Sequence, residues 1–185
     1  MTRARISELP YRYEASAVVP ATPVELFRHA DDPARLATHM DESSWMLFGG
    51  RFATETDAAG GRALGSRIRM HGRVLGVSLG LEESITERDP PHRKAWETLG
   101  EPRLLVIGRY RMGFDVDLDA RGSTFRVFID YALPVSMSGR WLGRLFGRRY
   151  ARWCTQRMLQ DVVRRFASPE AAHRHRADEI PRARR

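Results

Sequence analysis

The sequence predicts an α+β fold in which a curved antiparallel sheet of about seven strands wraps around one long C-terminal helix. Three observations support this prediction. Apolar and polar residues alternate with period two from about residue 45 to residue 134, two short capped helices follow the first strand, and a long helical pattern begins after Pro134. With 185 residues, 42% of them hydrophobic, the chain is long enough for one core and too short for two full domains.

The first strand and the helices after it carry clear boundary signals. Alternation predicts a strand from Tyr11 to Val19. The sequence Thr22-Pro23-Val24-Glu25 is a capping box, in which the Thr22 side chain caps the helix and Glu25 reaches back to the Thr22 amide. This helix ends at Asp31-Asp32-Pro33, and a second short helix is expected through about Met40.

Six further strands are expected, because turn residues interrupt the alternating region at five places. Each strand has one apolar face, as an antiparallel sheet covered on one side requires. The turns are Gly49-Gly50, Gly60-Gly61, Asp89-Pro90-Pro91, Gly100-Glu101-Pro102 and Arg121-Gly122. The apolar faces carry Ile68, Met70 and Val74; Val77, Leu79, Leu81 and Ile85; Val106, Tyr110, Met112, Phe114, Val116 and Leu118; and Phe125, Val127, Ile129, Tyr131 and Leu133.

The long helical pattern does not present one straight apolar stripe. Its first apolar group, around Trp141 and Leu145, points roughly 80° away from the second, around Leu159 and Val163. Either the helix bends near Gly147, or residues 138–147 form a separate lid over a pocket. A stripe of glycines at 139, 143 and 147 lets other backbone approach this segment closely. The expected domain is 11–167, between an N-terminal tail of residues 1–10 and a disordered polar tail of residues 168–185.

Nearly all of the net charge of +8 lies in the helical segment, since residues 138–166 hold eight arginines and one acid, Asp161. Arginine replaces lysine almost everywhere and asparagine is absent, which indicates a coding bias. The choice of arginine over lysine is therefore weak evidence for a function that needs a guanidinium group. Arg140, Arg144, Arg148 and Arg152 form a ridge with three interpretations: a solvated face, a contact with anionic lipid headgroups, or a contact with nucleic acid. The nearly neutral remainder provides no extended basic groove, so nucleic acid is the least favoured partner.

The other motifs exclude several classes of function. The lone cysteine, Cys154, allows no internal disulfide and is expected to be a buried thiol, and no apolar stretch suggests a signal or a membrane span. We therefore expect a cytoplasmic protein. Asp115 to Asp119 begins like a calcium loop, but Ala120 and Arg126 occupy positions that need glycine and glutamate. His29 and His39 match no metal spacing, so neither a metal nor any other cofactor is expected.

The order of elements from Tyr11 to Phe166 resembles the START-like, or SRPBCC, superfamily with its helix-grip fold. Three stretches carry the resemblance: Val19-Pro20-Ala21-Thr22-Pro23-Val24-Glu25-Leu26-Phe27, Gly65-Ser66-Arg67-Ile68-Arg69-Met70, and Glu87-Arg88-Asp89-Pro90-Pro91-His92-Arg93-Lys94-Ala95-Trp96-Glu97. The superfamily includes lipid-transfer START domains, birch-pollen allergens and polyketide cyclases. The resemblance therefore implies a cavity for an apolar ligand and does not choose between carriage and catalysis.

A curved sheet around one helix leaves a cavity between them, where a few polar groups orient a mostly apolar ligand. The candidate ligand-binding residues are Met70, Trp96, Tyr110, Met112, Phe114, Ile129, Tyr131, Leu142, Gly143 and Phe146, and the alternative for each aromatic or methionine is simple core packing. Glu83 interrupts an apolar face and would point inward with a raised pKa, unless a bulge turns it to water, which is the interpretation that the sequence favours.

Three hypotheses follow, in order of preference. The first is a binding or carrier protein for a small hydrophobic or amphipathic ligand such as a lipid, a polyketide or an aromatic molecule. The second is a cyclase, aromatase or dehydratase in which Glu83, Tyr110 and Tyr131 transfer protons. The third is a module that contacts an anionic membrane surface or a regulatory partner through Arg140, Arg144, Arg148 and Arg152. The ligand and the oligomeric state are left open.

Overall fold

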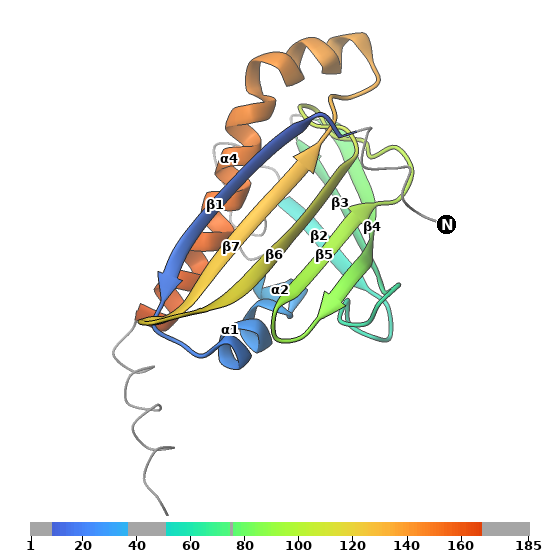
Figure 1. Cartoon of the computed structure of the whole chain (residues 1–185). Helices are drawn as coiled ribbons and strands as arrows, with labels where there is room; N and C mark the ends of the chain where they lie inside the picture. Colours follow the sequence, from blue (N-terminus) through green and yellow to red (C-terminus); the bar gives the residue numbers. More distant parts are fainter. Residues whose placement is uncertain (1–8, 37–50, 75, 168–185) are drawn as a thin grey trace, which may run out of the picture.

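The computed structural model describes residues 9–36, 51–74 and 76–167 and confirms the predicted α+β architecture (Figure 1). Seven antiparallel strands form one sheet in the order β1-β7-β6-β5-β4-β3-β2. The elements are β1 (Tyr11–Val19), α1 (Pro23–Ala30), α2 (Pro33–Leu36), β2 (Arg51–Thr56), β3 (Arg67–Val74), β4 (Val77–Asp89), β5 (Arg93–Thr98), β6 (Tyr110–Asp119), β7 (Gly122–Tyr131) and α4 (Met137–Ala167). The expected extension of the second helix to Met40 and both tails beyond residues 9 and 167 lie outside the described residues.

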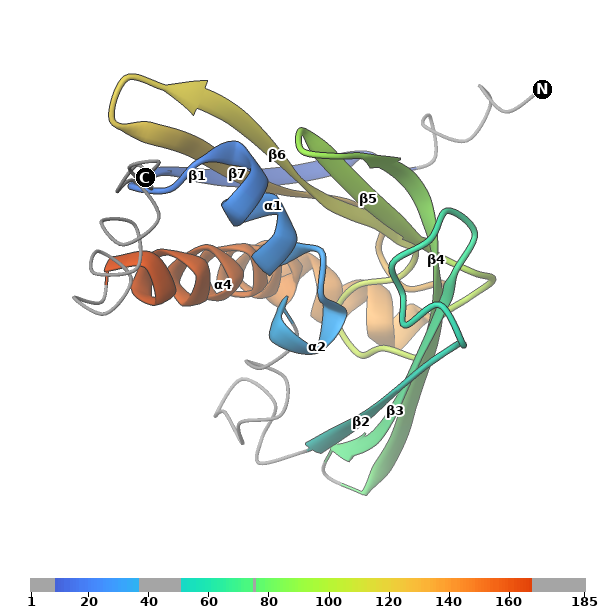
Figure 2. The ribbon, with the colours of Figure 1, turned by 90° about the horizontal axis from the view of Figure 1, so that it is seen from below.

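The sheet bends around the helices, as Figure 2 shows from below. Helix α4 runs along the concave face and packs mainly on β1 and β7, while α1 and α2 lie at one end of the sheet. The capping box forms as predicted: the Thr22 hydroxyl accepts a hydrogen bond from the Glu25 amide, and the Thr22 amide donates to the Glu25 carboxylate at 3.0 Å. The cap fixes where the chain leaves β1, and thereby where α1 and α2 meet the sheet.

A bulge interrupts the pairing of β4 with β5. Ile85 pairs with Trp96 and Glu87 pairs with Ala95, so Thr86 is an extra residue on β4. Glu83 lies before the bulge and pairs in register with Thr98, and its side chain is buried on the concave face. The favoured sequence interpretation, in which a bulge turns Glu83 to water, is therefore wrong, because the bulge comes three residues later.

Helix α4 is continuous from Met137 to Ala167, and Figure 1 shows that its first turns cross the end of the sheet before the helix bends to run along it. The predicted bend is therefore found, and residues 138–147 are not a separate element. The face that packs inward in these first turns is the glycine stripe of Gly139, Gly143 and Gly147. The large residue Trp141 instead points to solvent and is 64% exposed.

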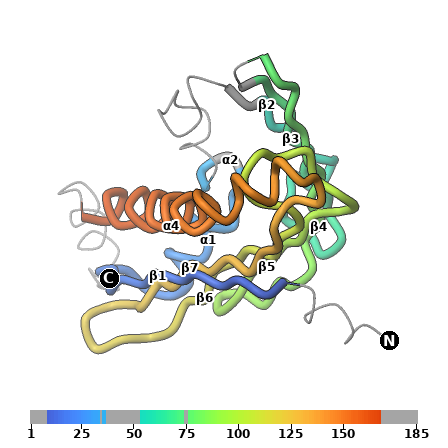
Figure 3. The backbone as a smooth tube through the Cα atoms, turned by 90° about the horizontal axis from the view of Figure 1, so that it is seen from above, coloured from blue at the N-terminus to red at the C-terminus, as the bar shows by residue number. Residues whose placement is uncertain are grey.

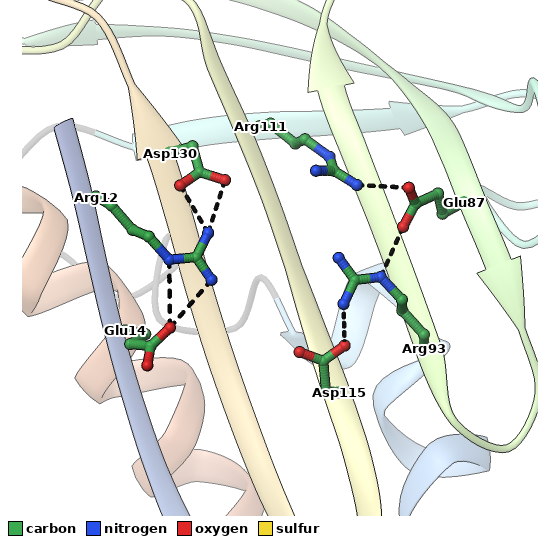
Figure 4. A network of polar contacts seen from close by, with 7 residues as sticks. All are labelled: Arg12, Glu14, Glu87, Arg93, Arg111, Asp115 and Asp130. Carbon is green, nitrogen blue, oxygen red and sulfur yellow. Dashed lines mark hydrogen bonds and ion pairs between the residues drawn. The ribbon is translucent and has the colours of Figure 1, made fainter. Parts of the chain in front are cut away.

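The convex face of the sheet holds a network of ion pairs between arginines and acidic residues (Figure 4). Arg12 contacts Asp130 at 2.8 Å and Glu14 at 3.0 Å, and Arg93 and Arg111 both contact Glu87 at 2.6 Å. The three guanidinium groups lie 5.0 to 5.8 Å from the centre of the Phe128 ring, which is fully buried although it faces away from the core. Paired acids balance these arginines, so the network stabilises the sheet and offers no unpaired charge to a ligand.

Candidate ligand-binding cavity

A cavity of about 90 Å³ lies between the concave face of the sheet and α4. This volume is several times what one buried water molecule needs. Its wall is formed by side chains from α2, from strands β3 to β7 inclusive, from the β5–β6 connection and from α4. They are Pro33, Leu36, Ile68, Met70, Leu81, Glu83, Ile85, Lys94, Trp96, Leu104, Ile107, Tyr110, Met112, Ile129, Tyr150, Cys154 and Met158.

Five of the ten predicted ligand-binding residues lie on this wall: Met70, Trp96, Tyr110, Met112 and Ile129. Phe114 is fully buried elsewhere in the core, where its ring packs against Phe27 and Phe125. Tyr131 is buried beyond the cavity and stacks on Tyr11, with ring centres 5.3 Å apart. These two side chains share the inward face of their strands with the wall residues, but they pack against other aromatic rings.

The other three predicted residues belong to the first turns of α4 and lie away from the cavity. Phe146 is 43% exposed, and Leu142 is half-buried. A Cβ atom added at Gly143 would lie 2.8 Å from the carbonyl oxygen of Val106, so this glycine contacts the β5–β6 connection and not the cavity. That connection separates the first turns of α4 from the cavity, because its residues Leu104 and Ile107 line the wall. The two segments lie side by side in Figure 3.

The main polar feature of the wall is a hydrogen-bonded pair. The Tyr110 hydroxyl donates to Oε1 of Glu83, and Trp96 is a second hydrogen-bond partner of the same carboxyl group. Burial raises the pKa of Glu83 to about 7, and the hydrogen bonds from Tyr110 and Trp96 only partly oppose this rise. Near neutral pH the carboxyl group is thus present in both protonation states, facing an otherwise mostly apolar cavity.

On the opposite side of the cavity, α4 contributes Tyr150, Cys154 and Met158. Burial raises the pKa of the Cys154 thiol to about 12 and the pKa of Tyr150 well above its ordinary value, so both groups stay neutral. The sequence analysis expected a buried thiol and did not select the other two. Their four-residue spacing continues the helix face of the glycine stripe, and that periodicity was the available signal.

Lys94 reaches the wall, but its ammonium group is already fully bonded. Nζ donates to the Asp31 carbonyl at 2.7 Å, to the Asp31 carboxylate at 2.8 Å and to the Gly61 carbonyl at 3.0 Å. Asp31 also pairs with Arg88 at 2.8 Å. An ammonium group has three donors, all of which are used here, so Lys94 ties the end of α1 to β5 and has no donor left for a ligand.

No cluster that could hold a metal ion appears among the residues that the structure describes. Within 9–36, 51–74 and 76–167, no group of three His, Cys, Asp or Glu side chains is placed to hold a metal ion. His29 packs edge-on against Phe166, and His39 lies outside the described residues. Arg140, Arg144, Arg148 and Arg152 are exposed on α4 and lie outside the cavity. None of the described helices is both long and apolar enough to cross a membrane.

The sequence profile of the family described as "Polyketide cyclase / dehydrase and lipid transport" matches residues 11–168, most of the chain. The chain belongs to this family. The resemblance to the START-like, or SRPBCC, superfamily is thereby confirmed. A search of curated protein sequences found no match.

Solved structures share the fold of this polyketide cyclase / dehydrase family member at low sequence identity. The Zhui aromatase/cyclase from Streptomyces sp. R1128 aligns with a TM-score of 0.61 and 14% identity, over 91% of this chain and 98% of that chain. The protein TTHA0849 from Thermus thermophilus aligns with a TM-score of 0.59 and 18% identity, over 85% of this chain and 100% of that chain. At these identities the likeness concerns the helix-grip fold alone.

Proposed function

We propose that the protein binds a small hydrophobic or amphipathic ligand in the cavity between its sheet and α4. The observation that carries this proposal is a mostly apolar wall with one hydrogen-bonded polar pair, Glu83 and Tyr110. Apolar walls favour a ligand by removing its surface from water, and a few fixed polar groups set its orientation. The family description, which includes lipid transport, agrees with this use of the fold.

The wall chemistry limits the ligand to a class. Most of the ligand surface must be apolar, because most lining side chains are aliphatic, aromatic or methionine. A polar end of the ligand would lie where Glu83 is, since a carboxyl group can form further hydrogen bonds beyond those with Tyr110 and Trp96. Lipid-like, polyketide-like and aromatic molecules all meet these requirements.

The test is the binding of 1-anilinonaphthalene-8-sulfonate, an aromatic amphiphile whose fluorescence rises in apolar sites. Ile129→Phe fills part of the cavity, and we expect it to weaken probe binding by about tenfold or more, because the probe loses contact area on the wall. Val127→Ile is the matched control: it adds one methylene on the same strand, at a fully buried position outside the cavity wall. Equal affinity of the wild type and Ile129→Phe would show that the probe binds elsewhere and would refute the proposal.

Acid–base catalysis of the cyclase or dehydratase kind is a second candidate, and the observation that favours it is the protonation state of Glu83. A carboxyl group with a pKa of about 7 can both accept and donate protons near neutral pH. Tyr110 lies against it and would orient it. Tyr131, the third residue of the sequence-based hypothesis, does not line the cavity and has no part in this candidate.

Deuterium exchange next to the carbonyl group of a small aromatic ketone, followed by NMR, tests this second candidate. A general base in the cavity would speed the exchange, and Glu83→Gln would abolish that effect while ligand binding remained. Glu82→Gln is the control, because Glu82 is the neighbouring carboxyl group, is absent from the cavity wall and pairs with Arg67. Exchange at the uncatalysed rate in the wild type would leave the protein a binder without this activity.

A further inference from the structure

In the first turns of α4, the small residues face inward and the large apolar residues face solvent. Glycines 139, 143 and 147 face inward, whereas Met137, Trp141 and Leu145 lie on the opposite side and are 82%, 64% and 49% exposed. These three recur every four residues, so they form one outward apolar row. An exposed row of large apolar side chains on a folded domain indicates a surface that contacts something.

A second row, of arginines, runs beside the apolar row. Arg140, Arg144 and Arg148 each follow an apolar residue of the first row by three positions, which places the two rows side by side on the helix. All three are exposed, and no acidic side chain among the described residues forms an ion pair with them. The sequence has no acidic residue between Asp130 and Asp161, so this end of the molecule is strongly positive.

The inward face explains why the large residues remain outside. Cβ atoms added at Gly143 and Gly147 would lie 2.8 and 3.1 Å from the Val106 carbonyl oxygen. The helix therefore packs directly on the backbone of the β5–β6 connection, and there is no room for larger side chains on that side. The outward rows are thus a fixed consequence of how α4 docks.

We propose that these two rows, Met137, Trp141 and Leu145 with Arg140, Arg144 and Arg148, bind the surface of an anionic phospholipid bilayer. A helix with tryptophan and leucine beside arginines lies in the plane of the interface, with its apolar side chains among the acyl chains and its cations at the phosphates. The first turns of α4, which carry the rows, cross one end of the sheet at the edge of the molecule (Figure 1), where a planar partner can reach them. This inference does not depend on the cavity being a ligand site.

Sedimentation with lipid vesicles tests the proposal on the full chain. We expect binding to phosphatidylcholine vesicles that contain about one-third phosphatidylserine, weaker binding at high salt, and none to pure phosphatidylcholine. Arg144→Glu/Arg148→Glu should weaken binding by about tenfold or more, since each basic residue near such a surface contributes about fivefold. Arg73→Glu/Arg121→Glu makes the same charge change at exposed positions elsewhere and should have little effect.

The apolar row needs its own pair of variants. Trp141→Gln/Leu145→Gln should weaken binding by about tenfold or more, because two large side chains no longer enter the bilayer. Leu64→Gln/Leu118→Gln removes apolar side chains that are 69% and 80% exposed outside the rows, and it should bind like the wild type. Brominated lipid should quench tryptophan emission in the wild type and much less in Trp141→Phe. Circular dichroism and thermal unfolding establish that each variant is folded.

Three results would overturn the proposal. The first is an equal loss of binding in Arg144→Glu/Arg148→Glu and Arg73→Glu/Arg121→Glu, because binding would then depend only on the net charge of the protein and not on the rows. The second is wild-type protein that does not bind anionic vesicles. The third is a different partner for the same rows. Tighter binding to soluble polyglutamate than to vesicles, lost in Trp141→Gln/Leu145→Gln, would indicate an acidic protein. Dimerisation that is lost in the same variant would indicate a second copy of the chain.

Discussion

The Tyr110 hydroxyl donates a hydrogen bond to the Glu83 carboxyl group inside the cavity. The two residues lie on strands that are not neighbours, because β5 separates β4 from β6. The curvature of the sheet brings their side chains together across β5, where Trp96 is a second hydrogen-bond partner of the carboxyl group. The hydrogen-bonded pair of Glu83 and Tyr110 therefore depends on the curvature of the sheet.

The pH dependence of stability should report the protonation of Glu83. Burial raises the pKa of Glu83 to about 7 in the folded state, above the ordinary value of 4.5. Between these values the folded state holds a proton that the unfolded chain has released, so the free energy of unfolding falls as pH rises, by about 3 kcal/mol in all. Glu83→Gln does not titrate, so its free energy of unfolding should rise by about 3 kcal/mol relative to that of the wild type between about pH 4 and pH 8. Urea unfolding measures it, with Glu82→Gln as control, and parallel curves for wild type and Glu83→Gln would contradict the assignment.

Lys94→Met should destabilise the fold by about 3 kcal/mol, because it leaves the buried Asp31 carboxylate with one cationic partner fewer. Burial alone would raise the pKa of Asp31, but the bonds from Arg88 and Lys94 outweigh it and lower that pKa. Arg62→Met is the control, since Arg62 forms an exposed pair with Asp32 and should cost less than about 1 kcal/mol. Denaturant unfolding compares the two, and equal small losses would show that the buried pair is not important for stability.

The glycine stripe predicts an order of sensitivity to alanine. Alanine favours a helix by about 1 kcal/mol over glycine, but at Gly143 its Cβ would meet the Val106 carbonyl oxygen at 2.8 Å and Leu133 at 2.9 Å. Gly143→Ala should therefore lower the melting temperature clearly. At Gly147 the nearest approach is 3.1 Å, so Gly147→Ala should change stability less. Thermal unfolding decides, and the reverse order would mean that α4 does not dock on the β5–β6 connection.

Cys154 is a chemical probe of the cavity, because it is the only cysteine and lies on the wall. With its pKa raised to about 12, almost no thiolate exists at about pH 8, so dithionitrobenzoate should label the folded protein far more slowly than the urea-unfolded protein. A ligand in the cavity should slow labelling further. Labelling of the native protein at the unfolded rate would show that the wall is open at this point.

The sequence predicts the order of the elements well, because local signals determine them. The capping box at Thr22 and the alternation along each strand act over a few residues and appear in the structure as predicted. The direction of Glu83 could not be settled in this way, since the bulge that decides it, at Thr86, leaves no distinct mark in the sequence. Alternation identified Glu83 as an acidic residue on an apolar face. Because the bulge lies at Thr86, the Glu83 side chain remains buried.

The remaining differences come from packing between distant segments. Hydrophobicity assigns Trp141, Leu145 and Phe146 to the core, but the close approach of the glycine face to Val106 leaves them outside. In the opposite sense, alternation assigns Phe128 to the convex face, where three arginines from three other strands bury it. Both outcomes depend on which segments meet in space, and no local pattern contains that information.

The arginine network around Phe128 has a consequence for the molecule as a whole. Because its cations on the convex face are matched by acids, that side contributes little to the long-range field. The excess positive charge lies instead on α4, whose residues 138–166 carry a net charge of +7. The charge of the folded chain is therefore unevenly distributed, and a negatively charged surface attracts the α4 side at long range, before any contact is made.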